Sequence, residues 1–432
     1  SLVLLITGLI IFNSSFTQEK VFLDSFVKDR FSSFFKILIL ISSVFVLNSS
    51  KGFIIDNKIN KFEYPIIILI SILGMFFMIS SNDLILFYLG LELQSLGLYI
   101  LASIDRDNLR SSESGIKYFV LSALSSGLLL YGCSLLYGFT GSTNFELIKE
   151  QLTRENTGAI FAMVFILVGL AFKVSAVPFH MWTPDVYEGA PTSITSFFAV
   201  VPKVAGLALL IKFMLIPFSN ILAEWQMILI FISIGSMILG AVAAIIQKNL
   251  KRLLAYSSIG HIGYALAGVA TGSASGYVSS IVYISIYVVM NIGAFSCLYL
   301  MRKDGEYKEN ISDLSGISKK HPVLALAFLI ILFSLAGIPP LGGFFAKFFI
   351  FTAVIEHKMY TLAIIGLLTT VISAFYYLRI IKTIYFDDSA ITFDPIKNKA
   401  AQSTILISCS FLLTYFLYPS VISKVVNLIF VN

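Results

Sequence analysis

Residues 64–80 read YPIIILISILGMFFMIS and contain no charged side chain. A run of this length is close to the ~20 residues with which a helix crosses a hydrocarbon core about 30 Å thick. Similar runs recur along all 432 residues, of which only 12% are charged, and the mean hydropathy is +0.90. They lack the apolar–polar alternation of membrane β-barrels. The sequence therefore predicts an all-α polytopic membrane protein.

Thirteen membrane crossings are expected along the chain. Their approximate cores are residues 2–16, 33–47, 64–80, 83–104, 113–137, 158–180, 192–217, 225–246, 251–270, 277–301, 322–357, 361–385 and 401–418. The first core is short for a crossing. Because residue 1 is Ser, we expect the beginning of that helix to lie outside this chain.

Two of the crossings are predicted to be broken. Residues 322–357 are too long for one simple helix and are interrupted by GIPPLGG at 337–343, where two prolines block continuation. In the crossing at 158–180, Pro178 closely follows Lys173, and an amphipathic stretch continues to Pro191. Irregular backbone at membrane depth persists only inside protein or beside water, so these breaks mark candidate ion sites.

The distribution of Lys and Arg predicts the orientation. When these residues are assigned to alternate sides of the thirteen crossings, one side receives roughly twice as many as the other. The richer side, which includes Lys51, Lys248 and Arg302, should face the cytoplasm or matrix. We call it the inner face; the C-terminus is then expected at the outer face.

A few ionisable residues are predicted to lie within the membrane. Lysines occur inside apolar segments at Lys117, Lys173, Lys203 and Lys347, and the similarly placed acid is Glu92. His261 lies roughly 17 Å along its helix. A lysine at the centre of a membrane helix costs about 2.5–3.5 kcal/mol on insertion scales. We therefore expect a polar, partly hydrated line through the bundle.

Lysine and carboxylate together suit proton transfer at such a depth. Burial favours the neutral amine, whereas a neighbouring carboxylate favours the ammonium form. At an effective dielectric constant of ~20, a unit pair 4 Å apart interacts by ~4 kcal/mol. Movement of Glu92 relative to a lysine would therefore switch that lysine between holding and releasing a proton. Arginine would not serve, because it stays protonated.

Structural explanations remain open beside this one. Glu92 would neutralise a neighbouring charge, and Lys117 would extend to the inner surface. Lys173 and Lys347 would cap free carbonyls, and His261 would make an interhelical hydrogen bond. Lys203 follows Pro202 at mid-membrane and is too deep to reach the surface easily.

Four motifs carry a resemblance. They are LGLELQSL (89–96), FKVSAVPFHMWTPDVYEGAP (172–191), LKRLLAYSSIGHIGY (250–264) and GIPPLGGFFAK (337–347). Together they resemble, in order and over nearly the whole chain, the antiporter-like subunits of respiratory complex I. Lys347 argues against the M-type member, which uses glutamate there, and the short C-terminal end argues against the L-type. The chain is most similar to the N-type.

The resemblance implies fourteen helices, here without most of the first two, built around two inverted five-helix repeats. It divides a single membrane domain (1–432) into N-terminal helices (1–80), two core halves (81–217 and 218–385) and a C-terminal helix (386–432). It also implies a role for each residue of the proton relay: Glu92 as the charge-gating acid, Lys173 and Lys203 as its partner lysines, His261 as a central relay residue, Lys347 as the terminal lysine and Lys117 as a further lysine of the N-type.

The function implied is proton translocation in the membrane arm of NADH:ubiquinone oxidoreductase, coupled to quinone reduction elsewhere in the complex. NADH, FMN, iron–sulfur clusters and ubiquinone are then expected on partner subunits, with no cofactor or metal bound by this chain. The alternatives are an Mrp-type cation/proton antiporter, a membrane-bound hydrogenase subunit, or a scaffold that transports nothing. The expected partners are other membrane-arm subunits and lipids.

The remaining composition agrees with this interpretation. Cys133, Cys297 and Cys409 form no C-x-x-C motif, and neither a P-loop nor a G-x-G-x-x-G is present. The net charge of +6 lies mostly in loops that flank the membrane, which favours contact with anionic lipid over nucleic acid. Abundant Phe, Ile, Lys, Ser and Asn are typical of an AT-rich genome. We expect the mitochondrial inner membrane, with a bacterial plasma membrane as the alternative.

Overall fold

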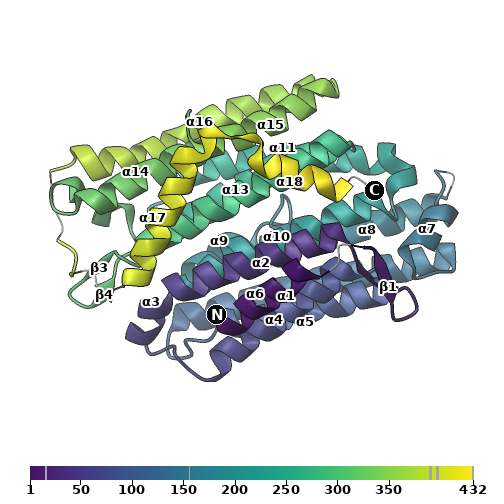
Figure 1. The fold of residues 1–432 in the computed structure, drawn as a ribbon, viewed down its shortest axis with the longest axis horizontal. Coiled ribbons are helices and arrows are strands. Elements are labelled where there is room, and N and C mark those ends of the chain that lie inside the picture. Colours follow the sequence, from purple (N-terminus) through teal and green to yellow (C-terminus); the bar gives the residue numbers. More distant parts are fainter. Residues whose placement is uncertain (15–16, 155, 389–391, 396–397, 431–432) are drawn as a thin grey trace.

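The computed structural model describes residues 1–14, 17–154, 156–388, 392–395 and 398–430. Within these residues, eleven helices are long and apolar enough to cross a membrane. They are α2 (Arg30–Ser49), α4 (Glu63–Ser80), α5 (Leu84–Ala102), α6 (Leu109–Thr140), α8 (Thr157–Val174), α10 (Thr192–Leu215), α11 (Leu222–Ile245), α12 (Leu250–Ala270), α13 (Ala274–Leu298), α16 (Tyr360–Phe386) and α17 (Lys399–Thr414). Most run roughly along the horizontal of Figure 1, whereas α17 crosses them at a steep angle.

The other predicted crossings correspond to shorter helices. α14 (Pro322–Ala336) and α15 (Gly342–Glu356) form one broken crossing, and α1 (Leu2–Asn13) occupies the first predicted core, whose residues 15–16 lie outside the described part. Each of the thirteen predicted crossings therefore has a helical counterpart, and the all-α membrane fold is confirmed. The amphipathic helix α18 (Ser420–Phe430) was not predicted.

Short elements occupy the loops. They are α3 (Lys51–Asp56), α7 (Phe145–Gln151), α9 (Trp182–Gly189), the 3-10 turns η1 (Ser219–Ile221), η2 (Ile311–Leu314), η3 (Ile317–Lys319) and η4 (Tyr415–Leu417), and the antiparallel strand pairs β1 (Glu19–Val21) with β2 (Phe26–Lys28) and β3 (Arg302–Lys303) with β4 (Glu306–Tyr307). Lys397, which contributed to the charge count, lies outside the described residues.

The order of elements repeats once along the chain. α4, α5, α6, α8 and α10 form the first set, and α11, α12, α13, the α14/α15 pair and α16 form the second. In each set the first two helices pack closely together, the first also packs on the fifth, and the fourth is broken. Because each set has five crossings, the second begins at the opposite face of the membrane from the first. This arrangement agrees with the two inverted five-helix repeats.

Glycines allow the leading pair of each repeat to pack closely. A Cβ atom on Gly74 of α4 would lie 2.7 Å from the carbonyl oxygen of Gly90 on α5. In the second repeat, a Cβ atom on Gly240 of α11 would lie 2.5 Å from the backbone nitrogen of Gly260 on α12. Small residues bring helix backbones together in membranes, where packing replaces the hydrophobic effect as a driving force. The backbones of α4 and α5, and those of α11 and α12, therefore approach closely at these glycines.

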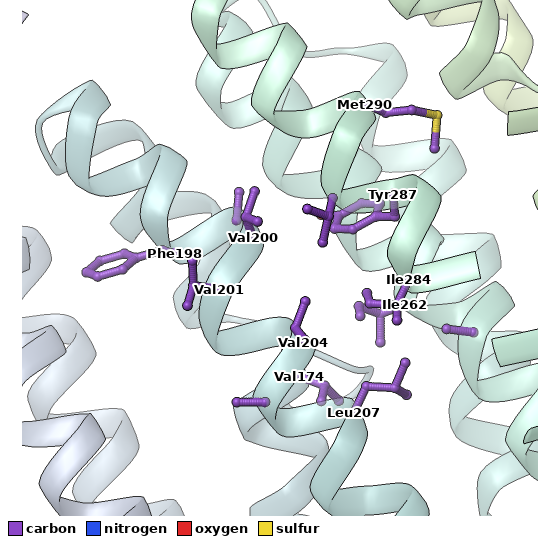
Figure 2. Packing of buried hydrophobic residues seen from close by; sticks show 14 of the residues in the cluster. Val174, Phe198, Val200, Val201, Val204, Leu207, Ile262, Ile284, Tyr287 and Met290 are labelled. Carbon is purple, nitrogen blue, oxygen red and sulfur yellow. The ribbon is translucent and has the colours of Figure 1, made fainter. Parts of the chain in front are cut away.

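Three helices form the centre of the bundle. All residues of the most apolar window of α10 are buried, as are 94% of those in α12 and α13. Figure 2 shows Val200 and Val204 of α10 packed near Ile284 and Tyr287 of α13. A polar side chain on α10 or α12 consequently faces protein and not lipid. Such a side chain is costly unless it finds a partner there.

At both predicted breaks the helix ends on a buried residue, Val174 or Ala336, whereas the prolines that follow at 178, 339 and 340 are exposed. α8 ends at Ser175, whose φ of 65° is left-handed, and α14 ends at Gly337 with a φ of 88°. Trp182 Nε1 donates to the carbonyl oxygen of Phe172 at 3.1 Å, and Lys347 Nζ donates to that of Ala336 at 3.0 Å. Carbonyls freed by the helix ends are thus satisfied by side chains, as membrane depth requires.

Candidate functional site

Lys173 occupies the last turn of α8 and is held by hydroxyl groups. Its Nζ donates to Ser95 Oγ of α5 at 2.7 Å and to Ser122 Oγ of α6 at 2.9 Å, and only 8% of the residue is exposed. Tyr99 Oη also donates to Ser122 Oγ. Because Trp182 caps the nearby carbonyl of Phe172, the amine is not needed as a helix cap. Three helices therefore position a lysine whose hydrogen-bond acceptors are neutral.

Glu92 lies on α5, one turn from a serine that holds Lys173. Glu92, Ser95 and Tyr99 are spaced i, i+3 and i+7, so they share one face of the helix. Glu92 Oε1 is buried and has no hydrogen-bond partner among the described residues, and Glu92 and Lys173 form no direct ion pair there. The carboxylate therefore has acceptor capacity to spare. Ser95 Oγ accepts from Lys173 and donates to the carbonyl oxygen of Leu91 at 2.6 Å, so its O–H is not directed at Glu92.

Lys203 lies at the middle of α10, with 1% of the residue exposed. Its Nζ donates to Ser258 Oγ of α12 at 2.7 Å and lies 5.7 Å from the ring centroid of Tyr187. Eleven residues separate Lys203 from the start of α10, which corresponds to a depth of about 17 Å. This amine cannot extend to either surface, and its hydrogen-bond partner is again a hydroxyl group.

His261 joins three helices of the second repeat. Its Nδ1 lies 2.6 Å from Tyr283 Oη of α13, and its Nε2 lies 3.2 Å from Tyr377 Oη of α16. Tyr377 Oη is also hydrogen-bonded to Ser257 Oγ. Each ring nitrogen thus faces a hydroxyl that can donate or accept. The arrangement fits both explanations open from the sequence, an interhelical contact and a relay.

Lys347 lies in α15, just after the second break, with 5% of the residue exposed. Its Nζ donates to the carbonyl oxygen of Ala336 and lies 4.9 Å from the ring centroid of Tyr264. Tyr264 Oη accepts a hydrogen bond from Thr370 Oγ1 at 3.0 Å. Lys347 therefore does cap a free carbonyl, and it also contacts the aromatic residue that follows His261 by one turn of α12.

α12 links Lys203 and Lys347. Ser258, His261 and Tyr264 follow one another at three-residue intervals and contact, in turn, Lys203, the tyrosines of α13 and α16, and Lys347. Lys173 and Lys203 are connected differently, through aromatic rings. The Nζ atoms of Lys173 and Lys203 lie 6.0 and 5.7 Å from the ring centroids of Tyr99 and Tyr187. Between these two rings, neighbouring ring centroids are separated by 5.0 Å (Tyr99 to Tyr118), 4.3 Å (Tyr118 to Trp182) and 6.4 Å (Trp182 to Tyr187).

Lys117 does not lie with the other lysines. Its side chain is 43% exposed, and its Nζ pairs with Glu113 at 2.8 Å and with Asp185 at 2.9 Å. Arg252 Nη1 lies 2.7 Å from Asp185 Oδ1 and 2.9 Å from Glu188 Oε2. The expected burial of Lys117 is wrong, because α6 contacts the bundle with only part of its surface and this residue lies near its inner end. A role of Lys117 in proton transfer stays a prediction.

These five residues, Glu113, Lys117, Asp185, Glu188 and Arg252, form the inner ionic cluster. They line a hollow of about 260 Å³ at the inner face. Partial burial acts to raise the pKa of Asp185, but hydrogen bonds from Lys117 and Arg252 outweigh it, so the pKa lies below its usual value. Unlike Lys173, Lys203 and Lys347, the cations here have carboxylate partners.

Three further buried lysines were not predicted. Lys36, Lys212 and Lys251 are 8%, 3% and 3% exposed, although their places near the ends of apolar runs predict positions at the membrane surface. Lys212 Nζ donates to the carbonyl oxygen of Ile79 at 2.9 Å, and Lys251 pairs with Glu309 at 2.8 Å. All three lie inside helices but near an end, where a count of crossings assigns them to the surface.

The hydroxyl partners were missed as well. Ser95 and Ser258 each lie three residues before or after a predicted site residue, and Tyr264 follows His261 by three. Helical spacing alone could have indicated these three. Ser122, Tyr283 and Tyr377 come from other helices, so only the tertiary structure identifies them.

Comparison with known proteins agrees with this architecture. A family model described as NADH:quinone oxidoreductase/Mrp antiporter matches residues 81–373. The NADH-quinone oxidoreductase subunit N of Pelagibacter ubique is 61% identical over 425 residues, covering 98% of this chain and 90% of that protein. A chain of respiratory complex I from Thermus thermophilus superimposes with a TM-score of 0.84 at 31% identity, covering 98% of this chain and 92% of that one.

A chain of the Mrp complex from a Dietzia species has a TM-score of 0.86 at 20% identity, over 99% of this chain and 89% of that one. This likeness concerns the fold alone, so it does not favour the antiporter alternative. The curated relatives are bacterial, which fits a multi-pass protein of a bacterial plasma membrane and gives no support to the mitochondrial location. The chain belongs to the NADH:quinone oxidoreductase/Mrp antiporter family, in its NADH-quinone oxidoreductase subunit N branch.

Proposed function

We propose that the chain transfers protons through the membrane arm of NADH-quinone oxidoreductase by way of Glu92, Lys173, Lys203, His261 and Lys347. One observation carries the proposal: Lys173, Lys203 and Lys347 each donate to a neutral oxygen and not to a carboxylate. Two of them are joined by the polar face of α12. A non-transporting scaffold would explain Lys347 as a cap of the Ala336 carbonyl but would leave the burial of Lys173 and Lys203 without an explanation.

Neutral partners allow both protonation states of a buried lysine. A hydroxyl or carbonyl oxygen accepts a hydrogen bond from the ammonium form and from the amine alike. An ion pair would instead leave a buried carboxylate unpaired whenever the lysine released its proton, which is strongly unfavourable. Lys203, which is hydrogen-bonded to Ser258, can therefore release its proton without leaving an unpaired carboxylate behind. Arginine at this position would stay charged.

Glu92 supplies the electrostatic bias in this proposal. Its unpaired carboxylate oxygen lies one helical turn from Ser95, which holds Lys173. At an effective dielectric constant of ~20, an ion pair is worth ~4 kcal/mol at 4 Å and about half of that at 8 Å. A shift of α5 or α8 by a few ångströms would therefore change the proton affinity of Lys173 enough to drive transfer.

Redox chemistry is assigned by this proposal to partner subunits. NADH, FMN, the iron–sulfur clusters and ubiquinone would be bound there, and the chain would act on protons only. The neighbouring membrane-arm subunits would deliver the conformational or electrostatic signal to Glu92. Within the chain, the two halves of the core at 81–217 and 218–385 would each contribute part of the path.

The test uses the intact complex that contains Lys203→Ala. We expect assembly to remain largely intact, because alanine removes a buried amine that burial disfavours. NADH-driven proton pumping in sealed proteoliposomes should fall by about a hundredfold, the scale of a positioned proton-transfer group. Lys203→Arg should fail to restore pumping, because arginine keeps its proton.

Lys248→Ala provides the matched control, since Lys248 is an exposed lysine at the inner face. This variant should pump at the wild-type rate. Full pumping by Lys203→Ala, with NADH oxidation still coupled, would remove Lys203 from the path and with it the central part of the proposal.

A further inference from the structure

A long apolar groove lies on the flank of the bundle between α14 and α17. Its volume is about 670 Å³. Ala327, Ile330, Ile405 and Cys409 form its floor, and each is at most 9% exposed. The residues of its rim include Val323 and Leu406, which are 81% and 68% exposed. α14 lines the groove only as far as Ile330, and the lining does not include Ala336, the residue of α14 that contacts Lys347, so the groove needs its own explanation.

The groove is confined to the inner half of the bilayer. Along α14, which runs with the bundle, its lining extends from Pro322 to Ile330, eight residues apart. This corresponds to about 12 Å at the rise of an α-helix. Half of a hydrocarbon core about 30 Å thick is ~15 Å. The groove therefore begins at the inner face and stays within one leaflet, while α17 crosses the neighbouring helices at a steep angle (Figure 1).

The inner end of the groove is polar and basic. Lys320, His321 and Gln402 line it, and the exposed Lys399 precedes Gln402 by one turn of α17. Partial burial lowers the pKa of His321, which favours its neutral form. Its Nε2 accepts a hydrogen bond from the backbone N–H of Phe393 at 2.9 Å, which leaves the ring proton on Nδ1 as a donor. The positive charge at the inner end of the groove therefore comes from lysine side chains.

The beginning of α14 adds to this character. The helix starts with Pro322, and the side chain of its N-cap residue, His321, makes no capping hydrogen bond. The first N–H groups of a helix lack intrahelical partners and carry partial positive charge. Backbone donors, a histidine donor and Lys320 thus surround the same inner end of an apolar groove.

We propose that this groove binds one anionic glycerophospholipid of the inner leaflet. The phosphate lies at Lys320 and the start of α14, and an acyl chain follows the apolar floor toward mid-membrane. Basic pockets between membrane helices on the cytoplasmic side suit anionic headgroups for this reason. A transmembrane helix from a neighbouring subunit fits less well, because it would need a groove that crosses the whole bilayer and would leave Lys320 without an anion.

The experiment uses the purified complex in detergent. It is given phosphatidylglycerol with a photoactivatable diazirine in one acyl chain or, in a separate sample, phosphatidylcholine with the same chain. After irradiation, mass spectrometry locates the label. Labelling should concentrate in residues 322–330 and 402–413, and phosphatidylglycerol should exceed phosphatidylcholine by about fivefold, the equivalent of ~1 kcal/mol for one lysine.

Two variants test the origin of that preference. Lys320→Gln should abolish the excess of phosphatidylglycerol labelling and leave phosphatidylcholine unchanged, whereas Lys248→Gln, which alters a lysine at the inner face outside the groove, should keep the excess. Leu406→Trp should lower labelling by both lipids, because it narrows the groove without changing its charge.

Equal labelling by the two lipids in the wild type would overturn the proposal and leave only non-selective lipid contact. Absence of label from both segments in the intact complex would also overturn it, since a protein partner must then cover the groove. Because neither measurement uses proton pumping, a failure here would not bear on the proposed function.

Discussion

Lys173 and Lys117 are alike in the sequence and opposite in the structure. Both lie in apolar runs, but Lys173 is 8% exposed and bonded to two serine hydroxyls, whereas the side chain of Lys117 is 43% exposed and paired with two carboxylates. The difference teaches that the face of the helix, and not the hydrophobicity of its neighbours in sequence, determines what a lysine can do.

The two environments also differ in energy. Exposed ion pairs contribute about 0.2–1 kcal/mol each and are weakened by salt. A buried amine with neutral partners is unfavourable as a cation, so small changes in its surroundings alter its charge. The inner ionic cluster is therefore suited to hold a fixed charge, and the buried line is suited to exchange protons. The following changes test this distinction, beginning with the largest expected effect.

Lys173→Ala and Lys117→Ala should separate the two environments most clearly. Removal of the buried amine should lower NADH-driven proton pumping in sealed proteoliposomes by about a hundredfold, because it interrupts transfer between Glu92 and the remaining lysines. Removal of the surface amine should lower pumping by less than about twofold, since it weakens only exposed ion pairs.

Both variants need the same abundance of assembled complex, measured on native gels, for this comparison to hold. Equal losses of pumping in the two variants would place Lys117 on the path as well. The inner ionic cluster would then be a part of the proton route and the contrast drawn here would fail.

Glu92→Gln should reduce pumping by about tenfold. Glutamine keeps the shape and the hydrogen-bonding capacity of the side chain but removes the charge that favours the ammonium form of Lys173. Glu113→Gln is the matched control, because Glu113 is an exposed carboxylate of the inner ionic cluster. Wild-type pumping by Glu92→Gln at normal abundance would leave Glu92 with a structural role only.

The fold was largely predictable because membranes act directly on composition. Apolar runs and the GIPPLGG break predicted crossings that the structure confirms. α18 was missed because its eleven residues are too few to cross a bilayer, and its apolar residues fall on one face. The length of an apolar run is what predicts a crossing, and a helix of eleven residues is too short to give that signal.

The candidate site was predictable only in part. Residue type and depth identified Lys203 and Lys347, which are indeed buried. The same reasoning placed Lys117 wrongly and overlooked Lys212, because burial depends on which helices pack on a given face. The hydroxyl partner Ser122 lies on a different helix from Lys173, and no local pattern in the sequence connects the two residues.

Ser122→Ala tests whether the hydroxyl partners matter to the buried line. The change removes a hydrogen-bond acceptor of Lys173, and a hydrogen bond to a charged group is worth about 1.5–3 kcal/mol. Because Ser95 remains, we expect pumping to fall by only about threefold.

Ser125→Ala is the control for this change, since Ser125 lies on the same helix and its buried hydroxyl has no partner among the described residues. Ser122→Thr keeps the hydroxyl and should restore most of the rate. If Ser122→Ala and Ser125→Ala pumped equally well, the serine contact would be packing without influence on the amine.

Asp185→Asn should have the smallest effect and should act on stability rather than transfer. Asparagine weakens the pairs with Lys117 and Arg252, so at low salt the variant should be less stable by about 1 kcal/mol or less. Asp107→Asn, which changes an exposed carboxylate outside the cluster, is the control. Heat-induced loss of the assembled complex measures both.

The pH dependence of this difference follows from the sign of the shift. The pKa of Asp185 in the folded chain lies below its usual value of 3.8, so its contribution is fully present above about pH 4 and is lost as the pH falls through the lowered value. The difference in stability between wild type and Asp185→Asn should therefore stay constant from pH 6 to 8 and become smaller only in acid. In ~1 M salt, where charges are screened over ~3 Å, the difference should disappear. A gap that persists in high salt would show that Asp185 acts through packing or a buried contact, and the inner ionic cluster would then resemble the buried line more than a solvated surface.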